Sequence, residues 1–117
     1  MIYKIGDLAR DFGVTLRTLR FYEDRGLITP TRSGTTRLYS ERDRERLRLT
    51  LFCKRIGLSL GEIREVLELQ EHDDGGSNSA RLFTVYEGQL KALEQQRRDT
   101  ERAIADLQQA MQTMQVN

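Results

Sequence analysis

The stretch RTLRFYEDRGLITP, from Arg17 to Pro30, decides how the N-terminal half of the chain folds. It holds two arginines and two aromatic residues within its first six positions, and it meets a glycine at Gly26. Thr15, just before the stretch, is a favoured helix N-cap, and a glycine commonly follows the last turn of a helix. We therefore predict a helix between Thr15 and Gly26.

The faces of this helix differ in chemistry. Leu16 and Leu19 are its expected inward contacts, because an amphipathic helix turns its apolar side chains towards the core. Arg17, Arg20 and Phe21 are three or four positions apart and share another face, together with an acidic residue. Guanidinium groups on such a face suit the major groove of DNA, where they donate to guanine or to phosphate oxygens. Two roles are open for Phe21: contact with DNA, or packing against the segment that follows Gly26.

A shorter helix precedes it. Ile5, Leu8, Ala9 and Phe12 fall at i, i+3, i+4 and i+7, which predicts an amphipathic helix that ends at Gly13. Two short helices joined by a tight turn predict a helix-turn-helix.

The helical period is lost between residues 26 and 40, where turn-forming residues bracket two strand-like pieces, Leu27–Ile28 and Arg37–Tyr39. We predict a small hairpin, or wing. Its basic residues exceed what a turn needs, which favours a second set of phosphate contacts. The expected contacts are Arg32, Arg37 and Tyr39, with Lys54 and Arg55 added from the end of the next helix.

Two capping boxes mark two more helices: Ser40 is followed by Asp43, and Ser59 by Glu62, with Gly57 between the helices. We expect residues 1–71 to form one compact DNA-binding unit. The side chains expected to point inward from these two helices are Leu47, Leu51, Ile56, Ile63, Val66, Leu67 and Gln70.

Residues 72–79, HDDGGSNS, lack apolar side chains and predict a linker. Across residues 80–116, apolar positions then recur at steps of three and four, which predicts a long helix in a coiled coil. A stripe of roughly 30 residues is about 45 Å long and outreaches a 70-residue domain, so we expect a second copy as partner rather than packing on its own domain. The predicted dimer contacts are Tyr86, Leu90, Leu93, Arg97, Thr100, Ile104, Leu107 and Met111.

The net charge of +1 conceals an asymmetry. Residues 1–55 hold 13 Lys/Arg against 7 Asp/Glu, whereas residues 56–117 hold 6 against 11. The basic half carries the arginine-bearing helix, which favours phosphate binding over an ordinary solvated surface. With no long apolar run and no signal pattern, we expect a cytoplasmic protein with no membrane partner.

Enzyme chemistry is not expected. The sequence has one histidine, His72, and one cysteine, Cys53, so neither a nucleophilic catalytic set nor a thiolate metal site can be assembled within it. His72, Asp73 and Asp74 are adjacent but are read as solvated linker residues. We expect no cofactor and no metal. A coiled-coil interaction protein without DNA binding is the alternative from another class.

Four segments occur in order along the first 70 residues: YKIGDLA at 3–9, RTLRFYE at 17–23 with GLI at 26–28, RLYS at 37–40 and IGLSLGEI at 56–63. Together they resemble the MerR family of bacterial transcription regulators, over residues 2–70. The resemblance implies a mainly α fold: a winged helix-turn-helix domain followed by a long C-terminal helix that forms an antiparallel coiled-coil homodimer.

The resemblance also implies a function. Such regulators bind a palindromic promoter site, and with a small-molecule effector they change the shape of promoter DNA so that RNA polymerase can use it. The residues that the resemblance assigns to DNA contact are Thr15, Arg17, Thr18, Arg20 and Tyr22 on the recognition helix, Arg32, Arg37 and Tyr39 on the wing, and Lys54. For Tyr22, the residue pattern itself leaves core packing open.

The chain departs from several branches of that family. It lacks the cysteines that metal-sensing members place around the long helix, which argues against thiolate metal sensing. Cys53 is similar to the single cysteine of aldehyde- or redox-responsive members, and packing as a small hydrophobic residue is the alternative. The wing and the glutamine-rich helix look most like the regulators of leucine and isovalerate catabolism.

Overall fold

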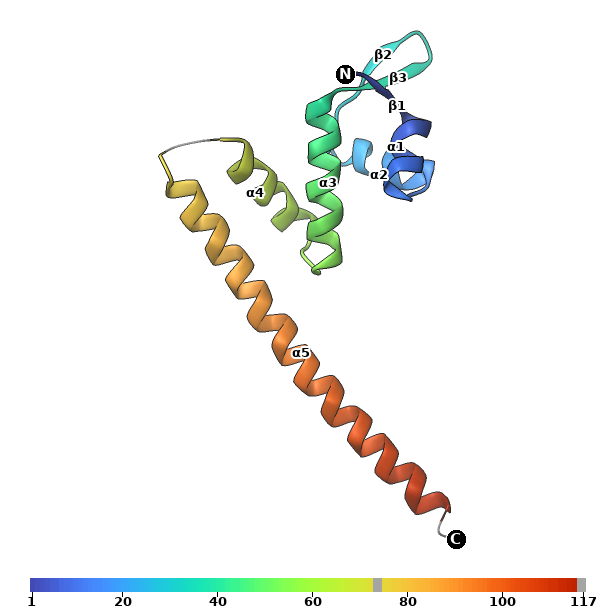
Figure 1. Ribbon diagram of the computed structural model, residues 1–117, viewed down its shortest axis with the longest axis vertical. Helices are drawn as coiled ribbons and strands as arrows, with labels where there is room; N and C mark the ends of the chain where they lie inside the picture. Colours follow the sequence, from blue (N-terminus) through green and yellow to red (C-terminus); the bar gives the residue numbers. More distant parts are fainter. Residues whose placement is uncertain (73–74, 116–117) are drawn as a thin grey trace. The chain divides into compact units, whose positions relative to one another are not determined.

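The computed structural model describes residues 1–72 and 75–115. The chain divides into two compact units, Met1–Asp73 and Asp74–Asn117, of which the second holds a single helix (Figure 1). The elements in chain order are β1 (Tyr3–Lys4), α1 (Ile5–Phe12), α2 (Leu16–Asp24), β2 (Thr31–Ser33), β3 (Thr36–Tyr39), α3 (Glu41–Arg55), α4 (Leu60–Glu71) and α5 (Ser77–Gln115).

The helix-turn-helix is confirmed. Gly13 is the C-cap of α1, and the backbone N–H of Thr18 donates to Thr15 Oγ1 at 3.1 Å, which caps the N-terminus of α2. After α2 the chain leaves through Gly26 at φ 74°, a left-handed conformation that only glycine adopts at no steric cost. Leu19 is fully buried, but Leu16 is 40% exposed, so its predicted inward position is wrong. Leu16 is the first residue of α2, and Cα–Cβ bonds in a helix tilt towards its N-terminus, so this side chain extends past the end of the helix.

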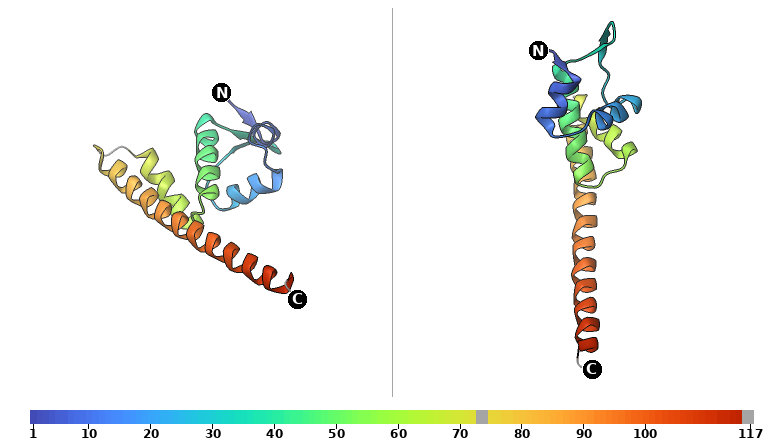
Figure 2. Two further views of the ribbon diagram at one scale, coloured as in Figure 1. Left: turned by 60° about the horizontal axis from the view of Figure 1, so that its bottom comes forward. Right: turned by 90° about the vertical axis from the view of Figure 1, so that its right-hand side faces the viewer.

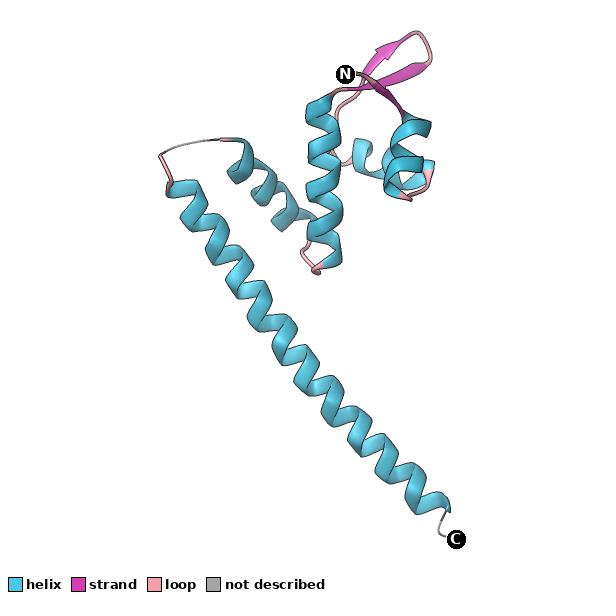
Figure 3. Ribbon diagram, viewed as in Figure 1, coloured by secondary structure: helices cyan, strands magenta, loops and turns pink. Residues whose placement is uncertain are grey.

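The wing is a hairpin of β2 and β3, and β1 extends it into an antiparallel sheet of order β1-β3-β2 (Figure 3). Ser33 pairs with Thr36, so the loop has two residues, the first being Gly34 at φ 64°. The predicted strand at Leu27–Ile28 is wrong: the strand lies at residues 31–33 instead. Both residues are fully buried in a loop, whereas strand side chains alternate between faces.

α3 and α4 begin at the predicted capping boxes. The N–H of Ser40 donates to Asp43 Oδ2 at 3.0 Å, and the N–H of Ser59 donates to Glu62 Oε1 at 2.9 Å. Asp43 is itself buried and also accepts from the N–H of Thr29 at 3.1 Å, which ties the loop before the wing to the start of α3. A carboxylate with several N–H partners can remain in a folded core.

The inward faces of α3 and α4 are only partly as predicted. Leu51 and Ile56 are half-buried and Gln70 is exposed, whereas Thr50 and Cys53 are fully buried. The period of α3 therefore brings its smaller residues, not all of its leucines, into the core. The apolar side chains that form this core are Leu8, Leu19, Tyr22, Leu27, Ile28, Tyr39, Leu47, Cys53, Leu58, Ile63, Val66, Leu67 and Leu69.

α5 begins at Ser77, so the helix takes in residues 77–79 of the expected linker. Position 116 of the predicted helix lies outside the described residues. With 39 residues the helix is about 58 Å long at 1.5 Å per residue. Much of its predicted seam is exposed, including Leu90 at 57%, Ile104 at 50% and Leu107 at 62%. Among residues 1–72 and 75–115, no helix has the length and hydropathy needed to cross a membrane.

Candidate nucleic-acid interface

The outer face of α2 presents two arginines. Arg17 and Arg20 are both exposed, as their spacing predicts. Phe21 is 39% exposed, and the guanidinium of Arg25 lies over its ring, 5.0 Å from the centroid. The Phe21 ring therefore supports Arg25 at the end of α2. Sequence reasoning missed Arg25, although its spacing of four from Phe21 was a usable signal.

Glu23 connects the recognition helix to the wing. Arg37 Nε donates to Glu23 Oε2 at 2.7 Å, and Arg32 Nη2 donates to Glu23 Oε1 at 3.4 Å. The side chains of Glu23 and Arg37 are only 17% and 22% exposed, so solvent screens this pair less than a surface pair. The two wing arginines therefore lie beside α2, in the hairpin that projects from the helices of its unit (Figure 2).

No role for Glu23 was predicted from the sequence. Its position three residues after Arg20, one helical turn from an exposed arginine, was the available signal that this carboxylate has a basic partner. Arg32 is 53% exposed and keeps more of its donors available than Arg37 does. Arg37 is thus held mainly by its ion pair with Glu23, whereas the side chain of Arg32 is mainly exposed to solvent.

Thr15 and Thr18 occupy the N-terminus of α2. Their hydroxyls lie 2.9 Å apart, and Thr15 Oγ1 also accepts from the N–H of Thr18. Thr15 therefore contributes first to the cap, while it remains exposed at the start of the recognition helix. Helix N-termini favour anions, so both hydroxyls stand where a phosphate would be stabilised.

Tyr22 and Tyr39 are placed in the core, with only 3% and 0% of their surface exposed. Burial raises the pKa of both phenols, and the carboxylate of Glu23 adds to the effect at Tyr39. Among the described residues, the Tyr39 hydroxyl has no hydrogen-bond partner. These placements support the packing alternative for Tyr22, and they do not support DNA contact by either ring.

Lys54 is exposed in the last turn of α3. The other end of α3 follows the wing directly, at Ser40. Since Lys54 comes 14 residues after Ser40, a rise of 1.5 Å per residue puts it about 20 Å from the wing. Lys54 and the wing arginines are therefore too far apart to contact the same phosphate.

Family models match almost the whole chain. The model described as MerR HTH family regulatory protein covers residues 3–70, and the model described as MerR, DNA binding covers residues 44–115. The chain belongs to the MerR family. The resemblance inferred from the four sequence segments is thus confirmed. Regulators of this family bind promoter DNA, and responses to effectors are typical of them.

Individual relatives agree with this family assignment. A ZntR homolog of Haemophilus influenzae, described as an HTH-type transcriptional regulator, is 42% identical over 69 residues, which are 57% of this chain and 51% of the relative. The mercuric resistance operon regulatory protein of Pseudomonas fluorescens is 34% identical over 105 residues, 88% of this chain and 70% of its own length. This MerR-family chain thus matches about half of the first relative's length.

Solved structures of the family share its architecture. HiNmlR, a MerR family regulator lacking the sensor domain and bound to promoter DNA, superposes with a TM-score of 0.68 at 26% identity, over 89% of this chain and 79% of HiNmlR. MtaN, the N-terminus of the Bacillus subtilis multidrug transporter activator, superposes with a TM-score of 0.67 at 29% identity, over 93% and 97% of the two chains. The winged helix-turn-helix followed by a long helix is therefore a family arrangement.

Cys53 is a core residue in this MerR-family chain. Its side chain is fully buried, and burial raises the pKa of its thiol to about 11. A thiol of this kind is a poor nucleophile, because the thiolate is the reactive form. Within residues 1–72 and 75–115, no cluster of three or more His, Cys, Asp or Glu side chains is arranged to hold a metal ion. Asp73 and Asp74, considered with His72 as cation ligands, lie outside the described residues.

Proposed function

We propose that the protein is a sequence-specific DNA-binding transcription regulator that binds a palindromic promoter site as a homodimer. The observation that carries the proposal is the exposed pair Arg17 and Arg20 on α2, beside a wing that presents Arg32. Family membership supports it, since regulators of the MerR family bind promoter DNA. A regulator of this kind acts in the cytoplasm, where bacterial DNA lies.

Each contact set has a distinct role in this proposal. Arg17 and Arg20 read base edges in the major groove, because guanidinium groups can donate two hydrogen bonds to guanine O6 and N7. Arg32 contacts phosphate from the wing, and Arg37 sets the wing beside α2 through Glu23. Thr15, Thr18 and Lys54 contribute further phosphate contacts, which fix position without reading sequence.

The dimer is formed by α5. Its apolar stripe includes Leu90, Ile104 and Leu107, each at least half exposed, and contiguous exposed apolar surface marks interaction sites. An antiparallel pairing of two copies covers this stripe and supplies two recognition helices related by a twofold axis. Two identical half-sites in the DNA, arranged as a palindrome, match that symmetry.

Regulation follows from DNA shape in this proposal. The bound dimer changes the bend and twist of promoter DNA in response to a small-molecule effector, and RNA polymerase is the partner that uses the altered promoter. Thiophilic metal ions are bound by accessible thiolates, and the one cysteine of this chain is buried. The effector is therefore expected to be organic rather than a thiophilic metal ion.

Fluorescence anisotropy tests DNA binding directly. A labelled duplex carrying the region upstream of the protein's own gene is titrated with the full chain, beside a duplex of the same base composition in scrambled order. We expect tighter binding to the upstream duplex, and an affinity for both duplexes that falls steeply with salt as counterions are released. Equal affinity for the two duplexes would contradict a sequence-specific regulator, and absence of binding would favour the coiled-coil interaction protein.

A further inference from the structure

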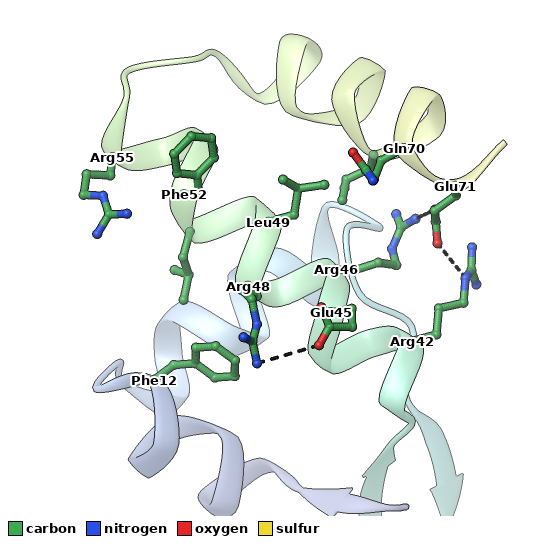
Figure 4. A pocket seen from close by; sticks show the side chains of 12 residues that line it. Phe12, Arg42, Glu45, Arg46, Arg48, Leu49, Phe52, Arg55, Gln70 and Glu71 are labelled. Atoms are coloured by element: carbon green, nitrogen blue, oxygen red, sulfur yellow. Dashed lines mark hydrogen bonds and ion pairs between the residues drawn. The ribbon is translucent and has the colours of Figure 1, made fainter. Parts of the chain in front are cut away.

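A groove of about 750 Å3 lies on one side of α3, between that helix, Phe12 of α1 and the end of α4 (Figure 4). Its volume is within the range of roughly 300 to 1,000 Å3 that small-molecule sites occupy. Of the residues predicted to contact DNA or to form the dimer, only Arg55 lines it. The lining is formed by Phe12, Arg42, Glu45, Arg46, Arg48, Leu49, Leu51, Phe52, Arg55, Leu67, Gln70 and Glu71.

The apolar part of the groove is unusual for a charged helix surface. Phe52 is 37% exposed, and Leu49 and Leu51 are half-buried beside it. An aromatic ring and two leucines left partly open to water provide a surface on which an apolar ligand body gains stability by burial. A surface that binds DNA phosphates does not need exposed apolar side chains, because phosphate contacts are polar.

The charged part of the groove is positive, with four arginines against two glutamates. Glu71 is already engaged: Arg42 Nε donates to it at 2.7 Å, and Arg46 forms a second ion pair with it. Arg48 pairs with Glu45 at 3.7 Å, but both side chains are more than half exposed, so this pair is weak.

Arg55 is the cation best placed for a ligand. Its guanidinium lies over the Phe52 ring, 5.9 Å from the centroid, and Figure 4 shows the two side chains together at one end of the groove. Among the described residues, no carboxylate lies within ion-pair distance of Arg55. Apolar surface and uncompensated positive charge are therefore adjacent.

We propose that this groove binds an amphipathic organic anion, with an apolar body on Phe52 and Leu49 and an anionic group on Arg55 and Arg48. Charge selects such a ligand over the long helix of a second copy. The stretch from 75 to 115 holds 5 Lys/Arg and 5 Asp/Glu, so it has no net charge to complement the groove. Guanidinium groups bind carboxylate and phosphate with charge-assisted hydrogen bonds, and a sulfonate offers acceptor oxygens of the same kind.

The groove is also connected to the recognition helix, and this regulatory step rests on the proposed function. Arg46 lines the groove and its Nε donates to the backbone carbonyl of Leu27 at 2.7 Å, just beyond the end of α2. Leu49, which the apolar body of the ligand covers, follows Arg46 by three positions on α3, so the bound ligand lies against the side chain that holds the loop after α2. Anion binding is therefore expected to change operator affinity.

A pair of fluorescent probes tests the site. 8-Anilino-1-naphthalenesulfonate carries an apolar body and a sulfonate, whereas N-phenyl-1-naphthylamine has a similar body without charge. With the full chain, we expect saturable binding of the sulfonate that weakens about tenfold in Arg55→Gln and in Arg48→Gln, because each variant loses a charge-assisted hydrogen bond. The uncharged probe is expected to bind the three proteins alike.

Arg10→Gln is the matched control, because Arg10 is an arginine of α1 that is 74% exposed and does not line the groove. Circular dichroism melts establish that all variants fold. Sulfonate affinity that is unchanged in both groove variants, or equally reduced in Arg10→Gln, would overturn the proposal. So would binding that appears only on dilution into monomers, since the groove would then be covered by a second copy.

Anisotropy of an operator duplex with and without the sulfonate separates the two proposals. Saturable, arginine-dependent probe binding with no DNA binding would support anion binding in the groove and contradict the proposed function. DNA binding without arginine-dependent probe binding would support the proposed function and contradict anion binding in the groove.

Discussion

At the scale of single residues, Arg20 and Arg32 are expected to contribute to DNA binding in different ways. Arg20→Ala should weaken binding to the preferred operator by about 1–3 kcal/mol and relax preference at one base position in each half-site. Arg32→Ala should weaken binding to all sequences nearly alike and reduce the salt slope by about 1. Anisotropy titrations against single-base operator variants measure both effects.

Arg10→Ala serves as control for these two variants, since Arg10 is exposed on α1 outside both contact sets. Arg32 is preferred to Arg37 for the wing test, because removing Arg37 would also leave half-buried Glu23 without its closer partner. If Arg20→Ala lost affinity equally at every base, base reading by Arg20 would be wrong.

Cys53 gives a second prediction at this scale, one that depends on pH. A pKa raised from 9.0 to about 11 reduces the thiolate at neutral pH by about a hundredfold relative to an unperturbed thiol. We expect labelling by Ellman's reagent at pH 7.5 to be slower than for a free cysteine by at least this factor, and to become fast in urea. Rapid labelling of the native chain would instead favour a sensor cysteine.

The same shift has a consequence for stability. The folded state holds the proton more tightly than the unfolded state, so the contribution of Cys53 is fully present below about pH 9 and is lost as the pH rises towards 11. Cys53→Ser should show less of this alkaline loss when the free energy of unfolding is compared at pH 8 and pH 10.5.

At the scale of elements, the link between α2 and the wing depends on Glu23. Glu23→Gln should lower the free energy of unfolding by about 1–2 kcal/mol, because it weakens a hydrogen-bonded ion pair in which both side chains are mostly buried. Glu45→Gln is the matched control: its pair with Arg48 is exposed, so a change below about 0.5 kcal/mol is expected. Urea denaturation of both variants measures the two changes in the free energy of unfolding. Equal changes would contradict a special role of Glu23 in holding the wing to α2.

The elements also show how far sequence reasoning reaches. Helix boundaries marked by local chemistry were predictable: Thr15, Ser40 and Ser59 each cap the helix that their hydroxyl and spacing indicate. β1 was missed, because its two residues carry no period and their partner strand begins more than 30 positions later. Leu27–Ile28 looked like a strand because β-favouring residues also fill buried loops.

The candidate site was predictable to the extent that exposure follows helical spacing. Arg17 and Arg20 are where their period puts them, but tyrosine has both an apolar ring and a hydroxyl, so sequence alone did not distinguish core from surface for Tyr22 and Tyr39. The Glu23 contacts needed the wing beside α2, a tertiary arrangement with no local signature.

At the scale of the whole molecule, the dimer is the condition for operator binding. Leu107→Asp places a carboxylate in the predicted seam, where an unpaired buried charge costs several kcal/mol. We expect this variant to sediment as a monomer at concentrations where the wild type is dimeric, and to lose high-affinity binding to a palindromic duplex. Gln108→Asp adds the same charge one position away from the seam and should remain dimeric. A monomeric Leu107→Asp variant with full operator affinity would refute the dimer proposal.

The most direct test of the central claim is selection of bound sequences from a random duplex library with the full wild-type chain, followed by sedimentation of the complex with the enriched duplex. The account predicts an enriched motif with two inverted half-sites and two protein chains per duplex. Enrichment of a single half-site with one chain bound, or no enrichment at all, would contradict it.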